Sequence, residues 1–251
     1  MTFETVFPSP AAARRPLPDG ERRWAEAGGS DTLGRVSTRP RLHVVSEAVA
    51  FAAFVALYLA LVHRLARVLD GPLELAAALL AVPFGALAAD FGTGFVHWAC
   101  DTFFDEDTPL IGRTVIYGFR EHHRDPLAMT RHGFLELNGA SCYVLVPILV
   151  VTLALGSLGA FGTAFVAVFT AGTALTNLFH RWAHAPEAPA VARFAQRRGW
   201  ILPPEHHAVH HTPPHRRAYC VTTGWANRSL DAIGLWARAE RWIRRAETAS
   251  S

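Results

Sequence analysis

Long apolar stretches separated by short polar segments run through the central part of the chain. The first covers residues 44–62 and the second residues 73–98, while residues 137–180 contain no Asp, Glu, Lys or Arg. A Gly-Ser-Leu-Gly break at 156–159 divides this last stretch into two segments of about 20 residues, each long enough to cross a bilayer. The pattern therefore predicts an all-α, multi-pass membrane bundle of about four transmembrane helices.

The first 42 residues differ from the rest, with five prolines, four glycines, seven arginines and no apolar periodicity. Such composition is typical of a flexible segment. We therefore divide the chain into a flexible leader at 1–42 and a single membrane domain at 43–251.

Charge sets the expected orientation of the bundle. All 24 basic residues are arginine, and four crossings would put 22 of them on one side, together with both termini and the loop at 99–136. The positive-inside rule then places that side in the cytosol. A formal charge of +3 is too small to indicate a nucleic-acid partner.

Histidine is the unusual component of the composition. Eleven of the 13 histidines occur at or after position 97. They fall at the predicted cytosolic ends of the second and fourth crossings or in the polar segments that follow. This clustering at one membrane edge predicts a histidine-rich, metal-binding cytosolic cap on the bundle.

Two of the candidate motifs lie at helix ends. Asp90, His97 and Asp101 fall within about 40° of one another on a helix, so they form one polar stripe. An acid inside a crossing is costly, and we expect Asp90 to accept a hydrogen bond from the ring of a metal-binding histidine. His180 and His184 are one helical turn apart, a spacing at which both can bind one metal ion.

Two further motifs lie in polar segments. The segment EHHAVHH (205–211) supplies an HxxHH pattern at His207, His210 and His211, whose i, i+3, i+4 spacing predicts a shared helix face for the three rings. His122 and His123 form another doublet. More than eight candidate ligands imply two metal ions, and the whole pattern is typical of an oxygen-activating, non-haem di-iron centre. A histidine-rich membrane metal transporter or sensor is the alternative of a different class.

These residues resemble a known family. The segments DFGTGFVHWACDT (90–102), TPLIGRTVIYGFREHHRDPLAMTRHGFLELNG (108–139), NLFHRWAH (177–184), ILPPEHHAVHHTPPH (201–215) and YCVTTGWAN (219–227) are similar to the Kua-type lipid desaturases. That family includes the plasmanylethanolamine desaturases and the bacterial CarF proteins. The resemblance covers about residues 90–240. Residues 1–89 contribute no motif to it, only their hydropathy.

The resemblance implies an activity and its cofactors. It implies an oxygen-dependent desaturase that makes the vinyl ether bond of plasmalogens from a 1-O-alkyl glycerophospholipid, with two iron ions and an external electron donor similar to cytochrome b5 or a ferredoxin. Desaturation of a phospholipid acyl chain is the alternative within the family. The enzyme would sit in a bacterial inner membrane, or in the endoplasmic reticulum of a eukaryote, with its metal site facing the cytosol.

The same resemblance implies a set of site residues. The metal ligands it implies are His97, Asp101, His122, His123, His180, His184, His207, His210 and His211. Residues expected to support them from outside the metal shell are Asp90, Glu121, His132, Asn177, His206 and His215.

Overall fold

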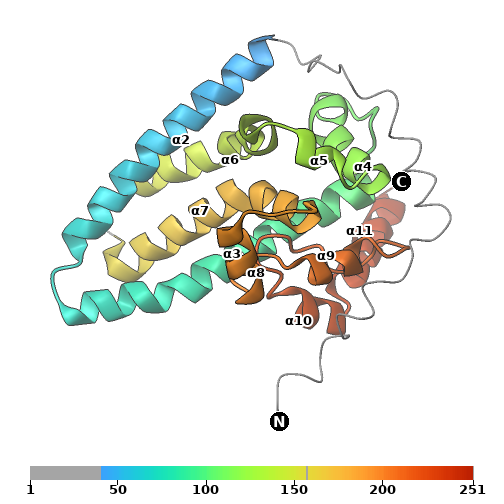
Figure 1. Ribbon diagram of the computed structural model, residues 1–251. Helices are drawn as coiled ribbons and strands as arrows, with labels where there is room; N and C mark the ends of the chain where they lie inside the picture. Colours follow the sequence, from blue (N-terminus) through green and yellow to red (C-terminus); the bar gives the residue numbers. More distant parts are fainter. Residues whose placement is uncertain (1–40, 157, 251) are drawn as a thin grey trace. The chain divides into compact units, whose positions relative to one another are not determined.

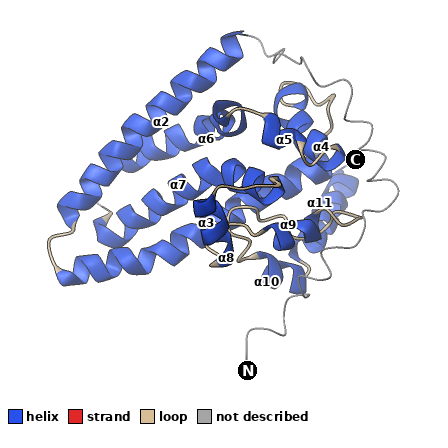
Figure 2. Ribbon diagram, in the orientation of Figure 1, coloured by secondary structure: helices blue, strands red, loops and turns tan. Residues whose placement is uncertain are grey.

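The computed structural model describes residues 41–156 and 158–250, and every regular element within these ranges is a helix (Figure 2). The four long helices are α2 (Arg41–Val68), α3 (Pro72–Phe103), α6 (Phe134–Ala154) and α7 (Gly159–His184). Each is long and apolar enough to cross a membrane, which confirms the predicted fold class. The predicted leader lies outside the described residues, apart from the two that begin α2.

The surface of this bundle is apolar. In the most apolar 18-residue stretch of each long helix, the fraction of buried residues is lowest in α2, at 17%, and highest in α7, at 39%. Exposed large apolar side chains therefore cover the outside of the helices, as in a bundle whose solvent is lipid. The chain is a multi-pass membrane protein.

Local sequence explains where the long helices begin and end. Pro72 occupies the first turn of α3, where its missing N–H leaves no broken hydrogen bond, and Phe104 ends that helix in an extended conformation. Gly156 and Gly159 have φ values of 83° and 64°, which favour glycine, and they make the turn between α6 and α7. This turn lies at the break predicted from the sequence.

Helices α3 and α7 approach each other closely because small residues line their contact. A Cβ atom on Gly85 would lie 2.8 Å from the carbonyl oxygen of Phe165, and one on Gly172 would lie 3.0 Å from the Cβ of Ala89. Glycine at such positions is typical of packed membrane helices. The close approach brings His97 of α3 beside His180 of α7, with ring centroids 6.0 Å apart.

Shorter helices gather around the ends of α3 and α7 (Figure 1). They are the π-helix η3 (Gly112–Ile116), α4 (Tyr117–Arg124), α5 (Ala128–Arg131), α8 (Ala190–Arg197), α9 (Pro204–His210), α10 (Asn227–Ala232) and α11 (Leu235–Ser250). Trp236 and Ile243 of α11 belong to an apolar cluster with Trp98 and Phe103 of α3. The short helices form a cap on one end of the bundle.

Candidate metal centre

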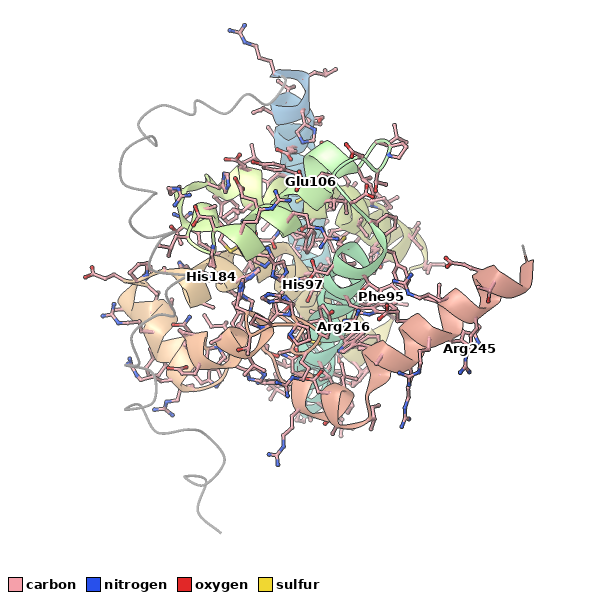
Figure 3. All side chains as sticks on the ribbon, turned by 90° about the vertical axis from the view of Figure 1, so that its right-hand side faces the viewer. Phe95, His97, Glu106, His184, Arg216 and Arg245 are labelled. Atoms are coloured by element: carbon pink, nitrogen blue, oxygen red, sulfur yellow. The ribbon has the colours of Figure 1, made fainter. Side chains whose placement is uncertain are left out.

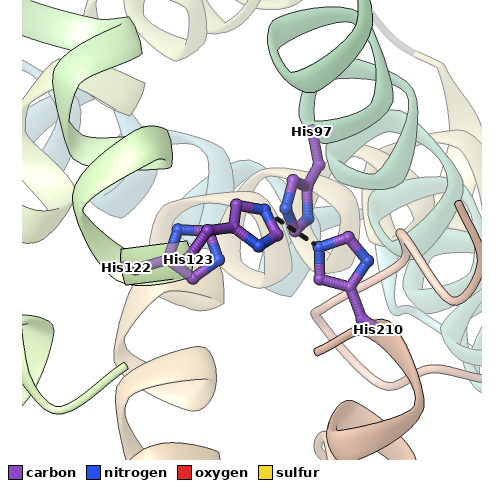
Figure 4. A group of neighbouring side chains, drawn as sticks. All are labelled: His97, His122, His123 and His210. Carbon is purple, nitrogen blue, oxygen red and sulfur yellow. Dashed lines mark hydrogen bonds between the residues drawn. The ribbon is translucent and has the colours of Figure 1, made fainter. Parts of the chain in front are cut away.

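The first histidine group surrounds a carboxylate of α3. Oδ2 of Asp101 lies 3.3 Å from Nε2 of His97, 3.0 Å from Nε2 of His123 and 3.6 Å from Nε2 of His210. The two Nε2 atoms of His123 and His210 are 3.3 Å apart (Figure 4). We call these four residues, which come from α3, α4 and α9, the Asp101 group.

The second group joins α7 to α9. Nε2 of His207 lies 2.7 Å from Nε2 of His180, 2.9 Å from Nε2 of His184 and 3.0 Å from Nε2 of His211. His180 and His184 bring their own Nε2 atoms within 3.2 Å, as their spacing predicts. We call these four residues the His184 group.

His122 lies between the two groups. One of its ring nitrogens falls within 4.8 Å of ligand atoms of His97, His123 and His210, and likewise of His180, His207 and His211. Its ring is 4% exposed, and its Nε2 is buried without a hydrogen-bond partner in the described part of the chain. A buried nitrogen with no partner is costly unless a cation or water satisfies it.

The spacing of these nitrogens suits metal binding better than hydrogen bonding. A neutral imidazole has one N–H, so the three mutual contacts among Nε2 atoms of His180, His184 and His207 cannot all be hydrogen bonds. Atoms about 2.1 Å from one metal ion stand about 3.0 to 3.4 Å apart, close to the distances found here. The donor set therefore fits one metal ion in each group.

Burial lowers the pKa of four histidines of the centre that lie outside the long helices. Burial, followed by the nearby histidine charges, holds the pKa values of His122 and His207 well below the usual range, and His210 is shifted the same way, chiefly by burial and His97. The same causes lower the pKa of His211 to about 2. Neutral imidazoles at pH 7 have lone pairs available to a metal ion.

Backbone carbonyls fix which ring nitrogen faces the centre. Nδ1 of His97 lies 3.1 Å from the carbonyl oxygen of Tyr219, and Nδ1 of His210 lies 2.8 Å from that of Arg217. A carbonyl can only accept, so Nδ1 carries the proton in both rings. The lone pair of each then sits on Nε2, which faces the Asp101 group.

Asp90 holds the segment that supplies one of these carbonyls. Its Oδ1 accepts backbone N–H groups of Thr222, Thr223 and Gly224 at 3.2, 2.8 and 2.9 Å, and its Oδ2 accepts that of Ala226 at 3.1 Å. We name residues 218–227 the strap. The sequence predicts that Asp90 accepts a hydrogen bond from the ring of a metal-binding histidine, whereas in the structure it accepts hydrogen bonds from the backbone of the strap.

The strap is also tied to both central helices. The hydroxyl of Thr222 lies 2.9 Å from that of Thr93 on α3 and 2.6 Å from that of Thr176 on α7. The side chain of Asn227 accepts from the N–H of Cys220 and donates to its carbonyl, at 2.8 and 2.9 Å. Tyr219 is thereby held at a fixed distance from α3.

The other predicted supporting residues have separate partners. His132 pairs with Glu121 at 3.0 Å, Asn177 donates to the Leu137 carbonyl at 2.6 Å, and His206 contacts Asn227 at 3.3 Å. His215 lies nearest the centre, with its ring centroid 5.0 Å from that of His123. The carbonyls of Tyr219 and Arg217 could not be predicted from the sequence, because the residue type does not indicate which backbone atoms accept hydrogen bonds.

The cap encloses the inner part of the centre, whereas His123, His184 and His211 are half-buried. His97, His207 and His210 are at most 2% exposed. Viewed from the capped end, His97 and His184 lie among the surrounding helices, whereas Arg245 projects from the outer side of α11 (Figure 3). The arrangement can hold two metal ions in a water-poor site at the end of a membrane bundle.

Comparisons with known proteins identify relatives of this chain. The lipid desaturase domain family matches residues 86–250. A plasmanylethanolamine desaturase of Myxococcus xanthus is 41% identical over 201 residues, which cover 78% of this chain and 70% of the relative. Plasmanylethanolamine desaturase 1 of Mus musculus is 36% identical over 233 residues, 88% of this chain and 84% of the relative.

A more distant similarity reaches a plant enzyme. The chloroplastic fatty acid desaturase 4 of Arabidopsis thaliana is 33% identical over 150 residues, which cover 59% of this chain and 46% of the relative. No solved structure matches the chain.

Proposed function

The chain belongs to the lipid desaturase family, and from this premise we propose that it forms the vinyl ether double bond of plasmalogens in a 1-O-alkyl ethanolamine glycerophospholipid. The observation that carries this proposal is the identity of 41% and 36% to two plasmanylethanolamine desaturases, over most of the chain. The similarity to a fatty acid desaturase is lower and covers less of the chain. Acyl-chain desaturation is therefore the second candidate.

The position of the candidate centre supports an ether-lipid substrate. The two carbons of a vinyl ether are the first two of the alkyl chain after the ether oxygen, so in a bilayer they lie just inside the headgroup layer. The histidines of α3 and α7 occupy the last turns of two membrane-spanning helices. A lipid in the surrounding membrane thus has its reacting carbons at about the depth of the centre.

We further propose that the two groups hold one iron ion each. The Asp101 group would bind through three imidazoles and one carboxylate, the His184 group through four imidazoles, and His122 would serve either ion. When bound, the two ions supply the oxygen activation needed to remove hydrogen from unactivated carbon, which no side chain can do by acid–base chemistry.

The side chains contribute orientation and exclusion of water. The carbonyls of Tyr219 and Arg217 keep the lone pairs of His97 and His210 directed at the centre. The cap keeps bulk water from a strongly oxidising site, which limits side reactions. The described residues thus prepare the site before substrate or oxygen arrives.

Electrons must come from another protein. Removing two hydrogens while reducing O2 to two molecules of water takes two electrons and two protons besides those of the substrate. We propose an acidic donor similar to cytochrome b5 or a ferredoxin, because the exposed Arg216 and Arg217 lie beside His215 at the edge of the centre. The arginine asymmetry of the sequence supports a cytosolic position for this edge.

Expression in a plasmalogen-free host tests the activity. The lipid extract is expected to contain an acid-labile vinyl ether that is absent when His184→Ala is expressed at the same level. A new acyl double bond without a vinyl ether would favour the second candidate. Unchanged lipids, with ether substrate and a reductase supplied, would contradict both.

A further inference from the structure

Helix α8 packs beside the last turns of a membrane span. Ala188, Ala192 and Ile201 are buried in one apolar cluster, against which Phe179 and Trp182 of α7 pack. Both α7 residues precede the end of that helix at His184. Helix α8 therefore lies alongside the edge of the span and does not extend away from it.

The outward side of α8 is apolar and aromatic. Val191 is 70% exposed, Phe194 42% and Trp200 58%. The rings of Phe194 and Trp200 meet edge to face with centroids 5.6 Å apart. In water such a patch would cost free energy, because about half of its apolar surface would stay in contact with solvent.

A second tryptophan continues this surface. Trp225 is 46% exposed, and its indole N–H donates to the carbonyl of Gly199 at 2.6 Å. The polar atom of the ring is therefore satisfied inside the protein. The part of the ring that remains exposed is apolar.

Arginines border the aromatic patch. Residues 188–202 include three arginines, at 193, 197 and 198, and no acid. All three are exposed, and the guanidinium of Arg198 lies 5.1 Å above the Phe194 ring. Aromatic rings with arginines at the edge of a membrane span match the chemistry of the lipid headgroup layer.

We propose that this surface, formed by Val191, Arg193, Phe194, Arg197, Arg198 and Trp200 and here named the α8 face, binds anionic phospholipid headgroups of the bilayer. Its apolar side chains lie at the boundary of the acyl chains, and its arginines contact phosphate groups. The charge of the face favours anionic over neutral headgroups by about fivefold for each arginine near the surface. Along the chain, the α8 face lies between His184 and His207, which both belong to the His184 group. Contact with the membrane therefore restrains the segment that connects these two histidines.

Spin labelling of the complete protein in vesicles tests the depth of the α8 face. The three native cysteines, Cys100, Cys142 and Cys220, are buried, so a nitroxide can be directed to an introduced cysteine. Trp200→Cys and Val191→Cys report on the face, and Asp107→Cys, in the exposed acidic loop after α3, is the control. The vesicles contain phosphatidylglycerol and phosphatidylcholine.

The label at 191 or 200 should collide more often with dissolved O2 than with a water-soluble nickel chelate, and the label at 107 should show the reverse. If the labels at 191 and 200 collided more often with the nickel chelate, as the label at 107 is expected to do, the α8 face would lie in water and the proposal would be overturned. Protection from both reagents at 191 and 200 would show a protein partner in place of lipid, and would overturn it as well. Neither outcome depends on vinyl ether formation.

Lipid selectivity tests the charge of the α8 face separately. The protein's preference for spin-labelled phosphatidylglycerol over phosphatidylcholine should fall in Arg197→Gln. It should stay unchanged in Arg228→Gln, which removes an exposed arginine from α10. If Arg197→Gln kept the same preference for phosphatidylglycerol as Arg228→Gln, this result would contradict anionic headgroup binding at α8.

Discussion

The Nδ1 atom of His97 and the carbonyl oxygen of Tyr219 are 3.1 Å apart, although 122 positions separate the two residues in the chain. This hydrogen bond links a helix that crosses the membrane to the strap at 218–227. It also decides which nitrogen of His97 faces the candidate metal centre. A change in the position of the strap should therefore change the affinity of the centre for metal.

Asp90→Asn should weaken metal binding without preventing insertion. The amide has one acceptor oxygen, so its NH2 group would face backbone N–H groups of the strap, and the negative charge that accepts four of them would be lost. Loss of such indirect support typically costs about 10- to 100-fold in metal affinity. Iron titration of purified protein measures this, with the exposed Asp107→Asn as the control.

Gly94→Ala should disturb the strap through packing alone. A Cβ at residue 94 would lie 2.5 Å from Sγ and 3.0 Å from Cα of Cys220, and such overpacking costs about 1 to 3 kcal/mol. Gly92→Ala on the same helix is the matched control, because its Cβ would meet only Phe169 at 3.8 Å. Thermal unfolding in detergent should separate the two variants. A Gly94→Ala protein as stable as Gly92→Ala would argue against tight strap packing.

Asp101→Asn should be nearly as damaging as losing a histidine. Its Oδ2 lies within 3.6 Å of three Nε2 atoms, and the amide replaces a charged oxygen by a neutral one with almost no change in volume. The expected result is loss of product together with loss of one metal ion per chain. Near-normal vinyl ether yield per inserted protein would remove Asp101 from the centre.

Three histidine variants should distinguish residues of the two groups from histidines outside them. His184→Ala removes a nitrogen within 3.2 Å of two others, so it should abolish product. His132→Ala removes a ring that pairs with Glu121 and Glu136 at 3.0 and 3.2 Å, outside both groups, and should retain part of the activity. His63→Ala, on the exposed surface of α2, should be neutral. Equal losses in all three variants would contradict the two groups.

Sequence spacing predicted the long helices and the i, i+4 pairs, because both depend on local geometry. It could not predict which of the two groups each histidine of residues 207–211 joins. The HxxHH pattern suggested one shared face for residues 207, 210 and 211, whereas His207 and His211 turn toward α7 and His210 turns toward Asp101. Helix α9 ends at His210 and lies between the two groups, so only the tertiary arrangement decides which group each ring joins.

The hydrogen-bond partners of Asp90 could not be predicted from the sequence for a similar reason. Its place on the polar stripe with His97 and Asp101 correctly indicated an inward position, since Asp90 is fully buried. Its partners are backbone N–H groups more than 130 residues away, which no side-chain motif encodes.

Metal analysis of anaerobically purified protein tests whether the centre holds two iron ions, because the Asp101 group, the His184 group and His122 together contain all nine predicted ligands. We expect two iron ions per chain in the wild-type protein and a lower content in Asp101→Asn. One zinc ion per chain and no iron would contradict this expectation.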